Sequence, residues 1–209
     1  MSKKGSLVII SGFSGAGKGT VVKELMNRYD CYALSVSATT RAPREGEVNG
    51  REYFFKTREE FEELIRQDAL YEYACYVSNY YGTPKAYVQE QLAAGKDVIL
   101  EIEVQGALKV KEKNPEALLL FVTPPSAEEL RNRLLHRGTE SEEVIQERMN
   151  RAAEESLLMD RYEYLIINDQ LDDCVTKVHQ LIQREHLRME ANTDMVTKLQ
   201  KELKEMKGE

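Results

Sequence analysis

Residues 6–18 read SLVIISGFSGAGK, and this stretch decides the fold. Residues 6–11 form a continuous apolar run rich in β-branched side chains, which is typical of a strand buried on both faces of a parallel sheet. Glycines follow at once, and apolar residues then recur at helical spacing over residues 20–28. The sequence therefore predicts a strand, a glycine loop and a helix in direct succession.

The glycine loop matches the pattern G-x-x-x-x-G-K between Gly12 and Lys18. In such loops the backbone N–H groups surround phosphate oxygens and the lysine adds a positive charge. We therefore expect nucleotide phosphates to bind here; a purely structural turn is the alternative. Gly19 follows the lysine where the general motif has Ser or Thr, and Thr20 comes one place later. The direct ligands of a magnesium ion therefore stay open, and we expect phosphates and waters to hold most of its coordination sphere.

Further apolar strands are predicted at residues 32–37, 97–102, 117–122 and 164–167, with helices between them. Capping patterns predict where several helices begin. They are Thr57 with Glu60 for a helix to about residue 67, Thr83 before Pro84, Ser126 with Glu129, and Thr139 with Glu142. Strands that alternate with helices imply parallel βαβ units, and therefore a doubly wound α/β sheet.

Residues 40–81 break this alternation and indicate an inserted subdomain, with short strands predicted at 53–55 and 70–77. The segment presents Arg41 and Arg44 between glycines and is rich in tyrosine. Forked guanidinium groups suit a phosphate dianion, and tyrosine hydroxyls can donate at its rim. The insert therefore offers a second anion site, separate from the glycine loop.

The motifs of the insert form an ordered series. It starts with SATTRAPREGEVNGREYFF at residues 37–55 and continues with Glu72, NYYGT at 79–83 and LEIEVQGA at 100–107. This series closely resembles guanylate kinases, over about residues 6–184. The resemblance implies a P-loop NTPase-type parallel sheet flanked by helices, with an inserted mixed α+β GMP-binding subdomain and a helical lid. It implies a domain over residues 5–184, with a core of about 5–37 and 96–184, an insert of about 38–84 and a lid of about 136–152.

The resemblance also implies transfer of the γ-phosphoryl group of ATP to GMP, with Mg²⁺, giving ADP and GDP. Carried over residue by residue, it implies ATP binding by Gly12, Phe13, Ser14, Gly15, Ala16, Gly17, Lys18, Gly19 and Thr20. The implied GMP phosphate ligands are Arg41, Arg44, Tyr53 and Tyr81; the guanine ligands are Ser37, Glu72, Thr83 and Glu103. The implied catalytic charges are Lys18, Arg41 and the lid arginines Arg137 and Arg148. Of the strand-end acids Glu101 and Glu103, the resemblance implies that one lies near the magnesium-bound waters and the other near the base. Which of them takes which place stays open.

The chemistry of these residues agrees with that function. Guanine offers adjacent N–H donors to a carboxylate such as Glu72 and an acceptor at O6 to a hydroxyl such as Ser37. Adenine inverts this pattern and leaves the carboxylate unpaired; a salt bridge on a strand face is the alternative role for Glu72. The attacking phosphate oxygen has a second pKa of about 6, so the reaction needs no general base. For Arg133 and Arg151, a solvated ion pair with a nearby glutamate is at least as plausible as catalysis.

Composition limits the remaining possibilities. The 209 residues carry a formal charge of −7, which argues against nucleic acid or anionic membranes as general partners. Small-molecule substrates and a cytoplasmic location are expected, and the three histidines and three cysteines show no spacing for a resident metal. Residues 185–209 form a charged helical extension with apolar residues at three- and four-residue spacing, counting Asn192 at one core position. It is either a solvated tail or a partner or self-association helix, so a homo-oligomer is possible.

Three other functions are alternatives to GMP phosphorylation: another nucleoside monophosphate kinase, a guanylate-kinase-like binding module without catalysis, and a simple ATPase switch. The intact loop and arginine set disfavours the module, and the switch leaves residues 41–53 unexplained.

Overall fold

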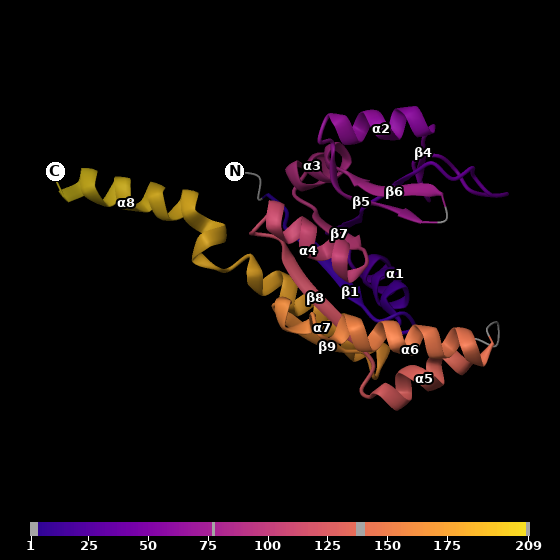
Figure 1. Cartoon of the computed structure of the whole chain (residues 1–209). Helices are drawn as coiled ribbons and strands as arrows, with labels where there is room; N and C mark the ends of the chain where they lie inside the picture. Colours follow the sequence, from indigo (N-terminus) through magenta and orange to yellow (C-terminus); the bar gives the residue numbers. More distant parts are fainter. Residues whose placement is uncertain (1–3, 77, 137–140, 208–209) are drawn as a thin grey trace.

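The computed structural model describes residues 4–76, 78–136 and 141–207, and it contains two sheets (Figure 1). The larger sheet has five parallel strands in the order β2-β7-β1-β8-β9. These strands are β1 (Leu7–Gly12), β2 (Tyr32–Leu34), β7 (Asp97–Glu101), β8 (Leu118–Thr123) and β9 (Tyr164–Ile167). The central strand β1 is buried along its whole length, as its apolar sequence predicts.

Helices cover both faces of this sheet, so the predicted doubly wound α/β architecture is confirmed. They are α1 (Lys18–Arg28), α3 (Lys85–Ala93), α4 (Val104–Lys113), α5 (Ala127–His136), α6 (Glu142–Ser156) and α7 (Leu171–Glu185). Because successive side chains of a strand point to opposite faces, β1 contributes to two cores. Val8 and Ile10 join the cluster that contains α1 and α7, whereas Leu7 and Ile9 join the cluster that contains α3 and α4.

The insert forms the second sheet, in the order β4-β3-β6-β5. Its strands are β3 (Ala38–Thr39), β4 (Phe54–Phe55), β5 (Leu70–Tyr76) and β6 (Asn79–Pro84), and α2 (Arg58–Arg66) packs on them around buried Phe61. The predicted capping box at the start of α2 is confirmed, since Thr57 and Glu60 bond each other's backbone N–H. In Figure 1 the insert stands to one side of the five-stranded sheet, and β5 packs against α4 of the core.

The predicted start of α3 was wrong. Pro84 is the residue before the helix, not its first residue, and Thr83 lies in β6. The physical reason is a competing hydrogen bond, because the Thr83 hydroxyl donates to the Glu72 carboxylate at 2.8 Å. The hydroxyl therefore holds two strands of the insert together.

Three other predicted ends of strands and helices differ, at least in part, from the structure. The strand predicted at 32–37 ends at Leu34. Helix α6 begins at Glu142 with Ser141 as its N-cap, and Thr139, the predicted cap, lies outside the described residues. At α5 the Ser126 hydroxyl accepts from the Glu129 N–H as predicted, but the Glu129 carboxylate pairs with Arg133.

The C-terminal extension is helical but not continuous. The Asn192 side chain donates to the carbonyls of His186 and Arg188, and a 3₁₀ turn at Met189–Asn192 separates α7 from α8 (Thr193–Lys207). Asn192 therefore caps a break instead of filling a core position of one long helix. Helix α8 projects away from both sheets (Figure 1), and its apolar residues Met195, Leu199, Leu203 and Met206 are exposed. Over the ranges that the structure covers, no helix combines the length and apolarity that a bilayer crossing requires.

Candidate active site

The glycine loop joins β1 to α1 at the carboxyl end of the sheet, and its backbone admits only glycine at key positions. A Cβ on Gly12 would lie 1.9 Å from the Val122 carbonyl oxygen. Gly15 and Gly17 have φ values of 91° and 87°, in the left-handed region that favours glycine. Gly17 caps α1, so the first N–H groups of that helix face the loop. These amides, together with the positive end of the helix dipole, make the loop an anion site.

Charged and polar side chains surround this loop. The Lys18 ammonium donates to the Gly12 and Phe13 carbonyls at 2.7 and 3.2 Å. Arg148 reaches from α6 to the Ser14 hydroxyl at 2.5 Å, so one of the two predicted lid arginines does lie at the loop. Arg137, the other, lies outside the described residues. Ala16 and Thr20 complete the loop segment, Ala16 buried and Thr20 exposed.

Phe13 supports the loop from below. Its ring is buried and meets Phe121 edge-on at a centroid distance of 5.0 Å. The side chain therefore belongs to the core, and only the backbone of Phe13 can face a phosphate.

Gly19 and Glu101 lie next to each other at the start of α1. A Cβ on Gly19 would be 3.4 Å from the Glu101 carboxylate, which brings an acidic group to the place where a Ser or Thr usually stands. Desolvation raises the pKa of Glu101; Lys18 opposes this rise, and Glu103 adds to it. The structure therefore puts Glu101, not Glu103, beside the glycine loop.

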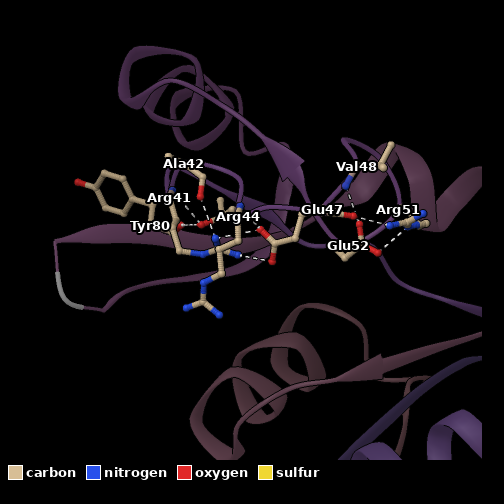
Figure 2. Close-up of polar contacts among 10 residues, drawn as sticks. Arg41, Ala42, Arg44, Glu47, Val48, Arg51, Glu52 and Tyr80 are labelled. Carbon is tan, nitrogen blue, oxygen red and sulfur yellow. Dashed lines mark hydrogen bonds and ion pairs between the residues drawn. The ribbon is translucent and has the colours of Figure 1, made fainter.

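The second cluster belongs to the insert and centres on Arg41 (Figure 2). Its guanidinium forms a two-pronged pair with Glu47, with Nη2–Oε1 and Nη1–Oε2 distances of 2.8 and 3.0 Å. The rings of Tyr53 and Phe55 lie on one side of it, with centroids 5.4 and 5.8 Å from the guanidinium carbon and 6.0 Å from each other. The Glu47 carboxylate raises the pKa of Arg41, and the Tyr81 hydroxyl adds to that rise. The predicted phosphate ligands Arg41, Tyr53 and Tyr81 therefore do come together.

Arg44 contributes to this cluster through its backbone, since its N–H donates to the Glu47 carboxylate at 2.7 Å. Its side chain is exposed. Hydrogen bonds from Arg41 and from the Arg44 N–H lower the pKa of Glu47, so the carboxylate is ionised at neutral pH.

Three of the four predicted guanine ligands form one row at the insert sheet. Ala38 pairs with Gly82 and Gly82 with Tyr73, so Thr83 of β6 lies between Glu72 of β5 and Ser37, which directly precedes β3. The 2.8 Å hydrogen bond between Thr83 and Glu72 agrees with this register. Desolvation raises the pKa of Glu72, and the bond from Thr83 and the charge of Lys109 oppose the rise.

Space for the Glu72 carboxylate comes from the core. A Cβ on Gly106 of α4 would lie 3.4 Å from Glu72 Oε2, which is at the tight end of normal contacts. Glu72 therefore projects from the insert onto a bare stretch of a core helix.

Glu103 is the one described guanine candidate that the structure does not bring to this row. It precedes α4 and pairs with Arg151 of α6 at 3.1 Å. Arg151 also pairs with Glu155, and Arg133 with Glu129, so both arginines form the ion pairs that the sequence predicts for them. Within the described ranges, no three His, Cys, Asp or Glu side chains gather as a metal ion would need.

Sequence reasoning missed two supporting residues. Glu47 lies inside the quoted motif without an assigned role, and Asn168 directly follows the strand predicted at 164–167. Asn168 is buried, and its side-chain amide donates to the Ala16 carbonyl at 2.9 Å, which fixes the backbone of the glycine loop at Ala16. An amide directly after a parallel strand, at the edge where ligands bind, is the signal that could have identified it.

Comparison with known proteins places these features in one family. A family model described as guanylate kinase matches residues 4–185. The chain is 56% identical to a guanylate kinase of Streptococcus thermophilus over 191 residues, covering 91% of each chain. It is 50% identical to one of Caldanaerobacter subterraneus over 202 residues, covering 97% of this chain and 98% of that one. A crystal structure of guanylate kinase from Anaplasma phagocytophilum is 30% identical with a TM-score of 0.68, covering 90% of this chain and 89% of that one.

Proposed function

This chain belongs to the guanylate kinase family and is an ATP:GMP phosphotransferase, and we propose that its two polar clusters hold the two nucleotides of that reaction. The observation that carries this assignment is the presence of two separate anion sites in one chain. One is the glycine loop with Lys18 and Arg148; the other is the Arg41 cluster beside the row of Ser37, Thr83 and Glu72.

On the ATP side, we propose that the amides from Gly12 to Thr20 hold the β- and γ-phosphates. Lys18 and Arg148 neutralise charge on the transferred group, and Arg137 is assigned the same role from sequence alone. The positive φ values of Gly15 and Gly17 support this assignment because they turn successive N–H groups toward one side.

On the GMP side, Arg41, Arg44, Tyr53 and Tyr81 hold the phosphate in this proposal. Glu72 accepts from the N1–H and N2–H donors of guanine, and Ser37 donates to O6. Thr83 orients Glu72, because its hydroxyl occupies one lone pair of the carboxylate. Glu103 acts at the edge of the base pocket only if its pair with Arg151 opens.

The transfer itself needs positioning more than acid–base chemistry. Near neutral pH the phosphate group of GMP is largely a dianion, so one of its oxygens can attack the γ-phosphorus of ATP in line. The two nucleotides repel each other, and Lys18, Arg41 and Arg148 offset that repulsion while the sites hold the reacting atoms in line.

The residues around the glycine loop fit a magnesium ion that is bound mainly by phosphates and waters. Such an ion neutralises phosphate charge when it is bound. The Glu101 carboxylate lies beside Gly19 at the start of α1, where it would accept hydrogen bonds from metal-bound water. We assign Glu101 to that place.

We also propose that residues 38–84 and the α5–α6 hairpin, including a lid of about 136–152, close over the substrates. Closure would exclude water, which competes with GMP as the nucleophile. The arrangement of Figure 1 supports this, because the insert and the hairpin lie on opposite sides of α1.

A panel of monophosphates tests the base assignment. With ATP and Mg²⁺, kcat/KM for GMP should exceed that for AMP or dTMP by about 10⁴, because neither base can pair with the Glu72 carboxylate as guanine does. ADP release in a coupled assay measures this directly. Comparable turnover of AMP and GMP would contradict the assignment.

The substrates and the exposed thiols of Cys31 and Cys75 support a cytoplasmic location. The net negative charge supports small-molecule substrates and not nucleic acid.

We propose that the apolar stripe of α8 serves self-association, because it is exposed in a single chain.

Removal of residues 193–209 tests this role of α8. The truncation keeps Asn192 and its bonds to α7, so kcat and both KM values should stay within about twofold of the full chain. Light scattering should report a larger particle for the full chain than for the truncated one. A monomer mass for both chains would exclude the self-association role.

A further inference from the structure

The pair between Arg41 and Glu47 has better geometry than an ordinary surface ion pair. Both side chains are only 17% exposed, and two hydrogen bonds join them in parallel. Two-pronged pairs of this kind fix the orientation of a guanidinium as well as attracting it. The orientation of Arg41 is therefore set before any substrate arrives.

The hydrogen bonds of Arg41 show which edge of its guanidinium is already occupied. Nη1 donates to Glu47 and, at 2.8 Å, to the Ala42 carbonyl, while Nη2 donates to Glu47. A guanidinium carries five N–H hydrogens on three nitrogens. The carboxylate takes the Nη1–Nη2 edge, so the Nε–Nη2 edge is a second fork of the same size.

Glu47 also holds the backbone around both arginines. Its carboxylate accepts the Arg44 N–H, and its own N–H donates to the Arg44 carbonyl at 3.1 Å. The Tyr53 and Phe55 rings pack against one side of the Arg41 guanidinium and limit its rotation there. One carboxylate thus joins the turn at residues 44–47 to the guanidinium of Arg41.

We propose that Glu47 is a positioning residue for the phosphate of GMP: it binds one edge of Arg41 and thereby presents the other edge to the substrate. This proposal rests on the assignment of Arg41 to the GMP phosphate. Glu47 does not touch the substrate; Arg41 is shared between a permanent carboxylate and a transient phosphate.

Simple electrostatics predicts the opposite effect, which makes the proposal testable. Glu47 adds a negative charge close to a phosphate dianion, so its removal should tighten GMP binding if charge alone mattered. If Glu47 instead occupied the phosphate's place on Arg41, its removal would also tighten binding. Only a positioning role makes binding weaker when the repulsive charge is gone.

The experiment compares Glu47→Gln with Glu52→Gln. Glu52 is a matched control because it lies in the same segment, pairs with Arg51 and accepts the Val48 N–H, away from Arg41 (Figure 2). Calorimetry with GMP and with guanosine, and steady-state kinetics with GMP and ATP, provide the readouts. A thermal melt confirms that each variant is folded.

In Glu47→Gln, the Kd and KM for GMP should rise about 10-fold or more, as for loss of a charged hydrogen-bond partner. The Kd for guanosine, which lacks the phosphate, and the KM for ATP should not change. Glu52→Gln should resemble the wild type in every readout. Unchanged or tighter GMP binding in Glu47→Gln, or equal weakening of guanosine, would overturn the proposal.

A double-mutant cycle with Arg41→Ala tests whether Glu47 acts through Arg41. Arg41→Ala alone should raise the GMP requirement far more than the ATP requirement. Adding Glu47→Gln to Arg41→Ala should then cause no further loss, whereas additive losses would overturn the proposal. A wild-type chain that binds no GMP would instead refute the proposed function, so the two failures are distinguishable.

Discussion

Lys18→Ala is expected to lower kcat about 10³-fold, which is the upper end of losses for a single preorganised donor at a reacting oxyanion. The ammonium is already placed over the glycine loop by the Gly12 and Phe13 carbonyls, so it needs little reorganisation when phosphates arrive. It faces charge that grows on the transferred group, which a methyl group cannot neutralise. The loss should therefore be larger in kcat than in the KM for GMP, which binds elsewhere.

Lys23→Ala is the matched control for this variant. Lys23 lies on the same helix, α1, but is exposed on its outer face. Its replacement removes an equal charge from the same helix without removing a group from the loop. A coupled ADP assay measures both variants, and near-normal turnover of Lys18→Ala would refute its catalytic role.

Glu72→Gln should lower kcat/KM for GMP about 10³-fold and narrow the preference for GMP over AMP, because an amide presents only one acceptor to the two N–H donors of guanine. Thr83 can still donate to the amide oxygen, so the strand pairing is retained. The monophosphate assay gives both numbers. The control is Glu62→Gln, which removes a half-exposed carboxylate of α2 that pairs with Arg58. An unchanged preference would place base selection elsewhere.

The pKa of Glu72 gives this residue a pH signature. In the proposed site GMP binds the ionised carboxylate, and desolvation raises the pKa of this carboxyl in the free enzyme above its usual range. Affinity should therefore fall as the pH drops through that raised pKa, and recover above it. Ionisation of the GMP phosphate contributes equally to wild type and Glu72→Gln, so the ratio of their affinities isolates Glu72. A pH-independent ratio between pH 4 and 7 would contradict this role.

The core of the fold could be predicted because its signals are local. The apolar runs of β1, β7 and β8 predict buried strands, and the run of β9 predicts a strand that the structure places, largely exposed, at the edge of the sheet. The glycine loop is recognisable from its spacing alone. The insert was harder. Strand β6 follows β5 directly and consists of polar and aromatic residues, so it is defined by its pairing with β3 and β5 and not by its own pattern.

The other wrong predictions also concern contacts that form only in the folded chain. Thr83 has the sequence of a helix cap, but its hydroxyl is taken by Glu72, eleven residues earlier in the chain. Asn192 fits a heptad, but its amide finds two carbonyls at the end of α7. The ion pairs of Glu47 with Arg41 and of Glu103 with Arg151 depend on folded geometry that spacing does not encode.

The contact between Glu72 and the bare surface at Gly106 has a consequence for how the enzyme discriminates among bases. The carboxylate that we assign to the base belongs to the insert, whereas the surface behind it belongs to the core helix α4. In this assignment, the choice of base depends on how the insert and the core pack against each other. Changes that alter how these parts seat against each other can shift nucleotide preference without touching a nucleotide ligand.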